Sequence, residues 1–196
     1  MRVAWVALIA GCGFQAQPAR DESPTAAADA AAFDFSTCPP SYTTTLTGSS
    51  RYRLIVEGHP AWEQSDTCAA DMPGATHLAV LDTLDERNAA AALINAAPTL
   101  ASSGAWIGAV QLRTATLTNQ AWFWFDGTPL TGSWNSGEPN DGGGGETDHR
   151  EQFVKLQKTR TGFTDQNGSE GDGALCECDG KPIAQIALDA IAASRL

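Results

Sequence analysis

The chain has 196 residues, of which 42% are hydrophobic, and a formal net charge of -11 at pH 7. This length and apolar content suit one compact domain with additional segments and exclude a chain that is disordered throughout. The negative charge repels phosphate groups, so we expect no nucleic-acid partner, whereas clustered carboxylates suit hard cations such as calcium.

The first eleven residues have the layout of an export signal, with a basic residue, an apolar run over residues 3–10 and small residues before Cys12. The run is far shorter than the roughly 20 residues that span a membrane. Residues 9–12 resemble a bacterial lipobox, which implies that 1–11 are a signal peptide and that Cys12 is lipidated. A buried first strand with a core cysteine is the alternative. The lipobox implies an exported protein that contacts the membrane only through its lipid. Gly13 after the cysteine implies that this membrane is the outer membrane or that the protein lies at the cell surface.

Residues 12–37 are predicted to form a flexible linker. From Gln15 on, Ala, Asp, Pro and Ser dominate this stretch, and almost nothing large is available for burial before Phe33. A helix over the alanines at 26–32 is the alternative, but a helix of that length is marginal alone in water.

Helical patterns occur in three places. Residues 60–72 have apolar positions at helical spacing. Thr83 and Glu86 form a capping box, which predicts the start of an alanine-rich helix that ends near Ala97. Residues 181–196 have the spacing of a short amphipathic helix, to which we assign no function.

Short apolar strands are predicted at 77–81 and 106–110. A run of four aromatic residues follows at 122–125, within a long tract rich in Thr and Gly. Two helices followed by short strands and a long loop indicate an α+β fold.

Five cysteines leave one unpaired, and lipidation of Cys12 accounts for it. Cys38, Cys68, Cys176 and Cys178 allow three pairings, and an exported chain favours disulfides. The two cysteines of the Cys-x-Cys pair do not readily bridge each other, so we expect each to pair with an earlier cysteine. A zinc site is the alternative, but the paired C-x-x-C spacing of such sites is missing and the three histidines are scattered.

Several motifs together resemble the C-type lectin-like domain in their order and spacing. In chain order they are Trp62 and Cys68 in WEQSDTC, Leu78 in GATHLAVL, Glu86, Trp106-Ile107-Gly108, Glu138-Pro139-Asn140 and Cys176-Glu177. The resemblance covers Cys38 to Cys178 and places the domain at 38–180, followed by a tail at 181–196. It implies an α+β fold of two helices, small antiparallel sheets and a long ligand loop. It also implies disulfides between Cys68 and Cys176 and between Cys38 and Cys178.

The sequence departs from the family pattern at the second internal disulfide. The two positions hold Phe153 and either Asn167 or Gly168. Both cysteines are missing together, so no thiol is left over. We expect the fold to stand and the long loop to be more mobile.

The resemblance implies Ca²⁺ as cofactor, bound by Glu138, Asn140, Glu151 and Asp165. An X-Pro bond at the centre of the motif is typically cis in the family, a form that proline permits. In binding members two vicinal sugar hydroxyls complete the calcium shell, and a Glu accepts while an Asn donates a hydrogen bond to them. Glu146 is the alternative to Glu151 if the loop is aligned differently.

Thr164 stands where the family has a ligating Asn, and we include it with Glu138, Asn140 and Asp165 in the ligand-binding set. Its hydroxyl is shorter and offers no amide donor, unless Asn167 takes that place. We therefore expect weak calcium affinity, on the order of 10⁻⁴ to 10⁻³ M.

Members with Glu-Pro-Asn favour mannose-type sugars, so the resemblance implies a surface lectin module whose partner is a glycan or glycoprotein. A metal-independent module that binds a protein partner or has a structural role is the alternative, with the residues around Glu138 acting as turn residues. We do not expect the protein to be an enzyme. The chain has no G-x-S-x-G nucleophile elbow, and its glycine run at 142–145 is not followed by the Lys of a phosphate-binding loop.

Overall fold

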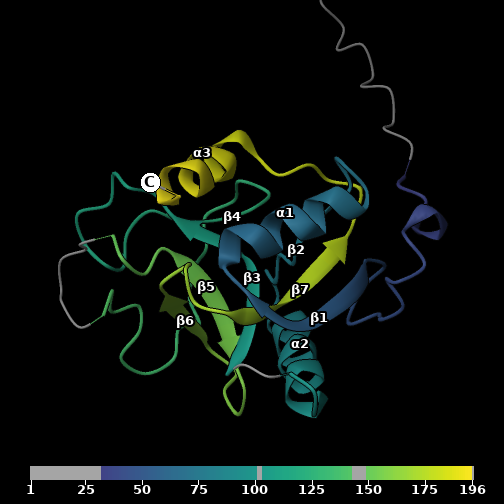
Figure 1. Ribbon diagram of the computed structural model, residues 1–196, viewed down its shortest axis with the longest axis horizontal. Coiled ribbons are helices and arrows are strands. Elements are labelled where there is room, and N and C mark those ends of the chain that lie inside the picture. The colour runs from purple at the N-terminus through teal and green to yellow at the C-terminus, as the bar shows by residue number, and fades with distance from the viewer. Residues whose placement is uncertain (1–31, 101–102, 143–148, 196) are drawn as a thin grey trace, which may run out of the picture. The chain divides into compact units, whose positions relative to one another are not determined.

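The structure, a computed structural model, describes residues 32–100, 103–142 and 149–195 (Figure 1). Nearly all of them belong to one compact unit that spans Phe33–Leu196. The end of the predicted linker and the predicted tail are therefore part of this unit, together with the predicted domain at 38–180. The predicted signal peptide and Cys12 lie outside the described residues.

The described residues form one 3-10 helix, three α-helices and seven strands. The helices are η1 (Phe35–Thr37), α1 (Ala61–Asp71), α2 (Leu84–Ala96) and α3 (Gln185–Ser194). The strands are β1 (Arg51–His59), β2 (Thr76–Leu78), β3 (Gly104–Gln111), β4 (Trp122–Trp124), β5 (Phe153–Gln157), β6 (Phe163–Gln166) and β7 (Asp172–Cys178).

The strands join in one mixed sheet with the order β1-β7-β3-β5-β6, and β2 and β4 pair with β7 and β3. Neighbouring strands are antiparallel except β3 and β7, which run parallel where residues 105–106 face 173–174. The α+β prediction is confirmed. The small antiparallel sheets that the resemblance implied are joined into one sheet, because this short parallel pairing links them.

The start of α2 follows the predicted capping box only in part. The Thr83 hydroxyl accepts from the backbone N–H of Glu86 at 3.2 Å, as a cap does. The Glu86 carboxylate instead turns into the core, where the Tyr52 hydroxyl donates to it. This helix is thereby tied to β1.

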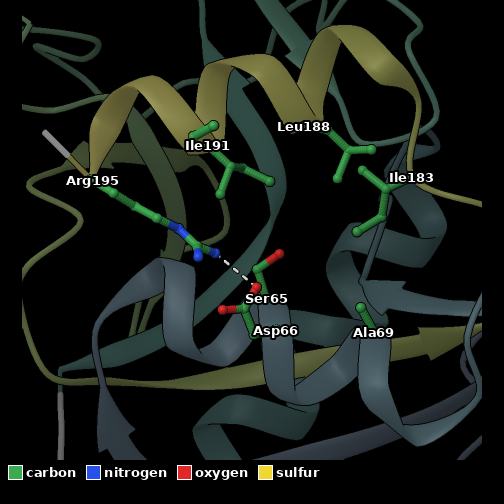
Figure 2. A pocket seen from close by; sticks show the side chains of 8 residues that line it. Ser65, Asp66, Ala69, Ile183, Leu188, Ile191 and Arg195 are labelled. Atoms are coloured by element: carbon green, nitrogen blue, oxygen red, sulfur yellow. Dashed lines mark hydrogen bonds and ion pairs between the residues drawn. The ribbon is translucent and has the colours of Figure 1, made fainter.

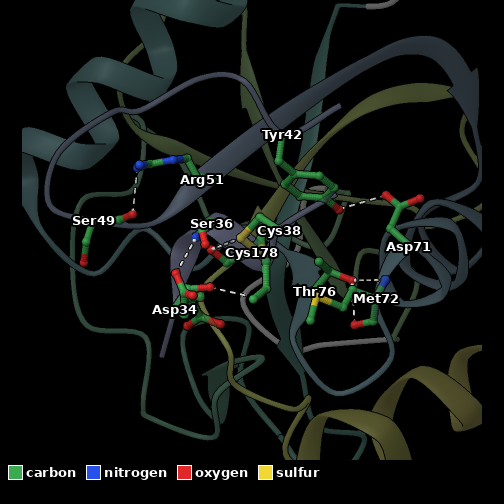
Figure 3. Close-up of a disulfide and its surroundings, with 12 residues drawn as sticks. Asp34, Ser36, Cys38, Tyr42, Ser49, Arg51, Asp71, Met72, Thr76 and Cys178 are labelled. Carbon is green, nitrogen blue, oxygen red and sulfur yellow. Dashed lines mark hydrogen bonds between the residues drawn. A yellow bond between two sulfur atoms is a disulfide. The ribbon is translucent and has the colours of Figure 1, made fainter. Parts of the chain in front are cut away.

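Both implied disulfides are present. Cys68 on α1 is bonded to Cys176 on β7, with their Cα atoms 5.5 Å apart. Cys38, just after η1, is bonded to Cys178 at the end of β7, with a Cα separation of 6.0 Å (Figure 3). The last strand therefore holds both the first α-helix and the N-terminal segment.

The packing of β3 explains why the Trp-Ile-Gly motif has a glycine at position 108. A Cβ at this position would lie 2.2 Å from the carbonyl oxygen of Leu78, far inside contact distance. Because glycine has no side chain, the backbone N–H of Gly108 can donate to Ala79 O at 2.8 Å. β3 thus packs directly on the chain that follows β2.

An aromatic contact fills the place of the missing family disulfide. A Cβ at Gly168 would lie 2.4 Å from the Phe153 ring, so the two positions are adjacent as the resemblance implies. The Phe153 ring also packs against Trp62 and Trp106, with centroids 6.4 and 6.2 Å away. The Gly168 carbonyl accepts from Ala61 N at 2.7 Å, which fastens this loop to α1 without a covalent bond.

The predicted tail helix exists as α3, which buries Ala187, Ala190 and Ile191. It lies beside α1, and Arg195 at its end is ion-paired with Asp66 at 2.7 Å (Figure 2). Among the described residues, no helix has the length and apolar character needed to cross a membrane.

Candidate functional site

The candidate calcium ligands come from three parts of the chain that the sheet brings together. Glu138 and Asn140 lie in the long connection between β4 and β5, and the peptide bond between Glu138 and Pro139 is cis. Glu151 lies two residues before β5, and Asp165 lies on β6. β5 and β6 are paired antiparallel, with Val154 opposite Asp165.

The carboxylate of Asp165 holds the loop of Glu138 and Asn140 in place. This side chain is buried, and its oxygens accept from the backbone N–H of Asn140 at 3.0 and 3.1 Å and of Asp141 at 2.8 Å. The Asn140 side-chain amide donates to Glu138 Oε2. Three of the four predicted ligands thus form one hydrogen-bonded group.

A second set of hydrogen bonds closes the loop around Glu151. Glu151 Oε2 accepts from Gly142 N at 2.6 Å. The buried Asp141 carboxylate accepts from the backbone N–H groups of residues 149, 150 and 151 at 3.0, 3.0 and 2.7 Å. Asp141 therefore joins the two ends of the loop, a role that its position in a turn-rich sequence did not indicate. The alternative ligand Glu146 lies outside the described residues.

Burial and neighbouring carboxylates raise the pKa of two glutamates at the site, Glu138 and Glu151. Burial, followed by the hydrogen bond and the negative charge of Asp165, raises the pKa of Glu138 to about 7. Burial and the charge of Asp165 also raise the pKa of Glu151. Like charges at short range disfavour ionisation, and a bound cation would relieve this. Carboxylate and amide oxygens are the ligand types that calcium takes, so the donor set fits that ion.

The structure does not bring Thr164 into this group through a hydrogen bond. Its buried hydroxyl accepts from the side-chain amide of Asn135 at 2.9 Å. Asn135 Nδ2 also donates to Gly162 O at 2.9 Å. Asn135, which the sequence did not single out, thereby ties β6 to the chain that leads into Glu138, and Thr164 serves that connection.

Of the described residues, His77, Glu177 and Asp179 alone form a trio whose potential ligand atoms lie within 4.8 Å of one another. The His77 ring nitrogens contact Leu78 O at 2.8 Å and Asp179 Oδ1 at 3.0 Å. Both partners are acceptors, so this geometry favours the charged ring, with a hydrogen on each nitrogen. Asp179 accordingly raises the pKa of His77 against the effect of burial. A doubly protonated imidazole has no lone pair for a metal, so this group is an ion pair.

No family model and no curated protein matches this chain. Solved structures do match. The carbohydrate-recognition domain of mouse scavenger receptor C-type lectin is 20% identical with a TM-score of 0.56, covering 72% of this chain and 98% of that one. The C-type lectin domain of murine dendritic cell inhibitory receptor 2, in complex with an N-glycan, is 20% identical with a TM-score of 0.54, covering 73% and 99%. A calcium-independent type II antifreeze protein is 19% identical with a TM-score of 0.57, covering 72% and 94%. Identities this low establish a shared fold, and none of these names is that of an enzyme.

Proposed function

The chain has the C-type lectin-like fold, and from this premise we propose that it is a calcium-dependent carbohydrate-binding module for mannose-type sugars. The observation that carries the proposal is the hydrogen-bonded group of Glu138, Asn140 and Asp165, which gathers side chains from the long loop and from β6. Glu151 lies at the other end of the same loop and bonds to Gly142.

In the proposed complex Glu138, Asn140, Glu151 and Asp165 each give an oxygen to the calcium ion. The other oxygen of Glu138 accepts, and the amide of Asn140 donates, a hydrogen bond to two vicinal hydroxyls of the sugar. Only one arrangement of hydroxyls satisfies both groups, which is the basis for a mannose-type preference. Thr164 is engaged with Asn135, so the site has one ligand fewer than the family pattern and affinity for calcium is weak.

Calcium should stabilise the protein through Glu138. With a Kd of about 1 mM, about 10 mM calcium raises the Tm by roughly 3 to 5 °C. Glu138→Gln should lose most of this gain, because it removes one charged ligand. Glu63→Gln on α1 removes an exposed carboxylate elsewhere and should keep the gain. Calorimetric titration and thermal melts measure both effects.

The sugar preference is tested on a glycan array with and without calcium. We expect mannose-type binding that a chelator abolishes, and a shift toward galactose when Glu138→Gln is combined with Asn140→Asp, since the donor and acceptor then exchange places. If calcium gives neither heat nor a rise in Tm, the calcium mechanism is wrong.

A metal-independent module is the second candidate, and one feature of the site favours it. The backbone N–H groups of Asn140 and Asp141 already satisfy Asp165, and Asn140 satisfies Glu138. The loop therefore has a set of partners that requires no cation. A protein partner whose affinity is unchanged by a chelator would support this candidate.

We further propose that the module is exported and anchored through a lipid on Cys12, in the outer membrane or at the cell surface. The lipobox-like sequence and the pairing of the other four cysteines support this. Cys12→Ser should move the protein from the membrane fraction to the soluble fraction and abolish labelling by a fatty-acid analogue. Unchanged membrane retention of the variant would contradict lipidation.

A further inference from the structure

Arg87 is a buried cation for which the described part of the chain offers no counter-ion. It lies in the first turn of α2, is 9% exposed, and its guanidinium carbon stands 5.3 Å from the centroid of the Phe163 ring. Its Nε is buried and has no hydrogen-bond partner. Among the described residues, no carboxylate forms an ion pair with it, and burial lowers the pKa of Arg87 with no acidic group opposing the effect. Buried charges are normally paired, so this arrangement requires a reason.

Arg87 is one of the residues that line a polar pocket of about 330 Å³ beside β6. Three hydroxyl-bearing residues, Ser133, Ser136 and Thr161, also line it, and no acidic residue does. Hydroxyl groups can donate hydrogen bonds to an anion. The pocket thus combines a positive charge with neutral donors.

A second pocket of similar volume shows the contrast. It lies between α1 and α3 and is also lined by an arginine, Arg195 (Figure 2). There the guanidinium is paired with Asp66 at 2.7 Å, and the remaining wall includes Ile183, Leu188 and Ile191. Asp66 neutralises that arginine, whereas none of the described carboxylates is paired with Arg87.

We propose that the Arg87 pocket binds an oxyanion, a carboxylate or sulfate group, carried by an acidic sugar. A guanidinium presents a planar fork of N–H donors that matches the geometry of such groups. The anion site follows from the pocket itself, and its assignment to a sugar rests on the proposed function.

The pocket adjoins the candidate calcium site. Phe163, against which Arg87 packs, is two residues from Asp165 on β6. Ser136 is two residues from Glu138, and Glu138 N donates to Asn135 O at 3.0 Å. A glycan held at the loop through its hydroxyls would therefore present its next residue near Arg87. The ligand class is an acidic saccharide of more than one residue.

The anion site is tested first with inorganic sulfate, in a chelator and at constant ionic strength. Sulfate stabilises most proteins by exclusion from their surface, so the specific effect is the part that depends on Arg87. At about ten times its Kd, sulfate should raise the Tm of the wild type by about 3 to 5 °C more than that of Arg87→Met. Met keeps an unbranched apolar stem against Phe163. Arg51→Met removes an arginine from β1, at the other end of the sheet order, and should retain the wild-type gain.

Arg87→Lys keeps the charge without the planar fork and should retain only part of the gain. Equal sulfate gains in the wild type and Arg87→Met would overturn the proposal. If Arg87→Met does not fold, as judged by near-ultraviolet circular dichroism, calorimetric titration of the wild type decides, since absence of heat with sulfate overturns the proposal equally.

The sugar assignment is tested in calcium with neutral mannose disaccharides, their uronic-acid counterparts and their sulfated counterparts. We expect either acidic form to bind at least ten-fold more tightly than the neutral one, and Arg87→Met to remove the difference while leaving neutral binding intact. A sulfate effect without any sugar binding would contradict the proposed function and the sugar assignment but retain the oxyanion site. Calcium-dependent mannose binding without an effect of Arg87→Met would retain the proposed function but contradict the binding of an acidic sugar at Arg87.

Discussion

Two buried carboxyl groups share one tyrosine hydroxyl in the core. Tyr52 on β1 lies within hydrogen-bond distance of Glu86 on α2 and of Glu177 on β7, at 3.1 Å from the latter. A phenol has one hydrogen to donate, so it cannot satisfy both groups. Burial raises the pKa of Glu86 to about 7 and also raises the pKa of Glu177, which the positive charge of His77 opposes. Glu86 therefore keeps a proton well above the pH at which an exposed glutamate releases it.

This proton makes stability depend on pH. The folded state binds it up to a pH of about 7, whereas the unfolded chain releases it near the ordinary value of 4.5. The unfolding free energy should therefore fall as pH rises from 4.5 to 7, because the folded state binds more protons throughout that window. The raised pKa of His77 has the same sign, and its contribution is lost as pH rises above 6.5.

Glu86→Gln should flatten the decrease between pH 5 and 7 by about 2 kcal/mol, since the amide keeps an acceptor for Tyr52 but cannot titrate. Urea unfolding in a chelator measures the slope. His77→Gln is the companion variant. It should leave the decrease of the unfolding free energy below pH 6 unchanged. A stability that rises between pH 5 and 7 in the wild type would contradict this account.

At the residue scale, the sequence could predict the side chains whose role is carried by a local motif. Glu138, Pro139 and Asn140 are consecutive, and their cis bond and mutual hydrogen bond are local properties. Arg87 and Asn135 could not be predicted in the same way. Their importance depends on Phe163 and Thr164, which reach them only when β6 pairs in the folded chain.

The same distinction holds for whole elements. The predicted helix at 60–72 is α1, whose buried positions recur at helical spacing, and the predicted strand at 106–110 is the middle of β3, a strand that is buried throughout. β1 was not predicted. Its burial does not alternate, and Tyr52 is its one fully buried residue, so the strand depends on pairing with β7, which is more than 100 residues away in sequence.

A buried ion pair connects two of the strands. Lys155 on β5 and Asp172 on β7 are both almost inaccessible, with Nζ and Oδ2 2.8 Å apart, and Lys155 also contacts Ser103 and the ring of Trp106. Removal of one partner leaves the other charge buried and uncompensated. Lys155→Met should therefore destabilise the domain by about 3 to 5 kcal/mol.

The matched control removes both charges. Lys155→Met combined with Asp172→Leu should recover most of the loss, because two apolar side chains of similar size can replace a buried pair at little cost. Guanidinium unfolding of the wild type, the two single variants and the double variant measures the coupling. If the double variant is as unstable as the sum of the single ones, the cost comes from packing and not from the unpaired charge.

At the scale of the whole molecule, the two disulfides join distant parts of the chain to the same strand. They span 140 and 108 residues in sequence. The chain-entropy model gives each about 4 to 5 kcal/mol, and the stabilisation grows so slowly with loop length that the two differ by only about 0.2 kcal/mol. Their surroundings differ more, since Cys68 and Cys176 are both fully buried whereas Cys38 is half-buried.

Loss of the Cys68–Cys176 disulfide, which closes the shorter loop, should therefore destabilise the domain more than loss of the Cys38–Cys178 disulfide. Replacement of Cys68 and Cys176 by Ala removes the cross-link and also leaves a cavity between α1 and β7, which adds about 1 to 2 kcal/mol. Replacement of Cys38 and Cys178 frees the N-terminal segment with a smaller packing loss. Guanidinium unfolding of the two double variants, with free thiols counted to confirm the remaining bridge, measures the order. If the variant that lacks the Cys38 bridge is the less stable one, loop length or the N-terminal segment matters more than burial, and the ranking argued from the core is wrong.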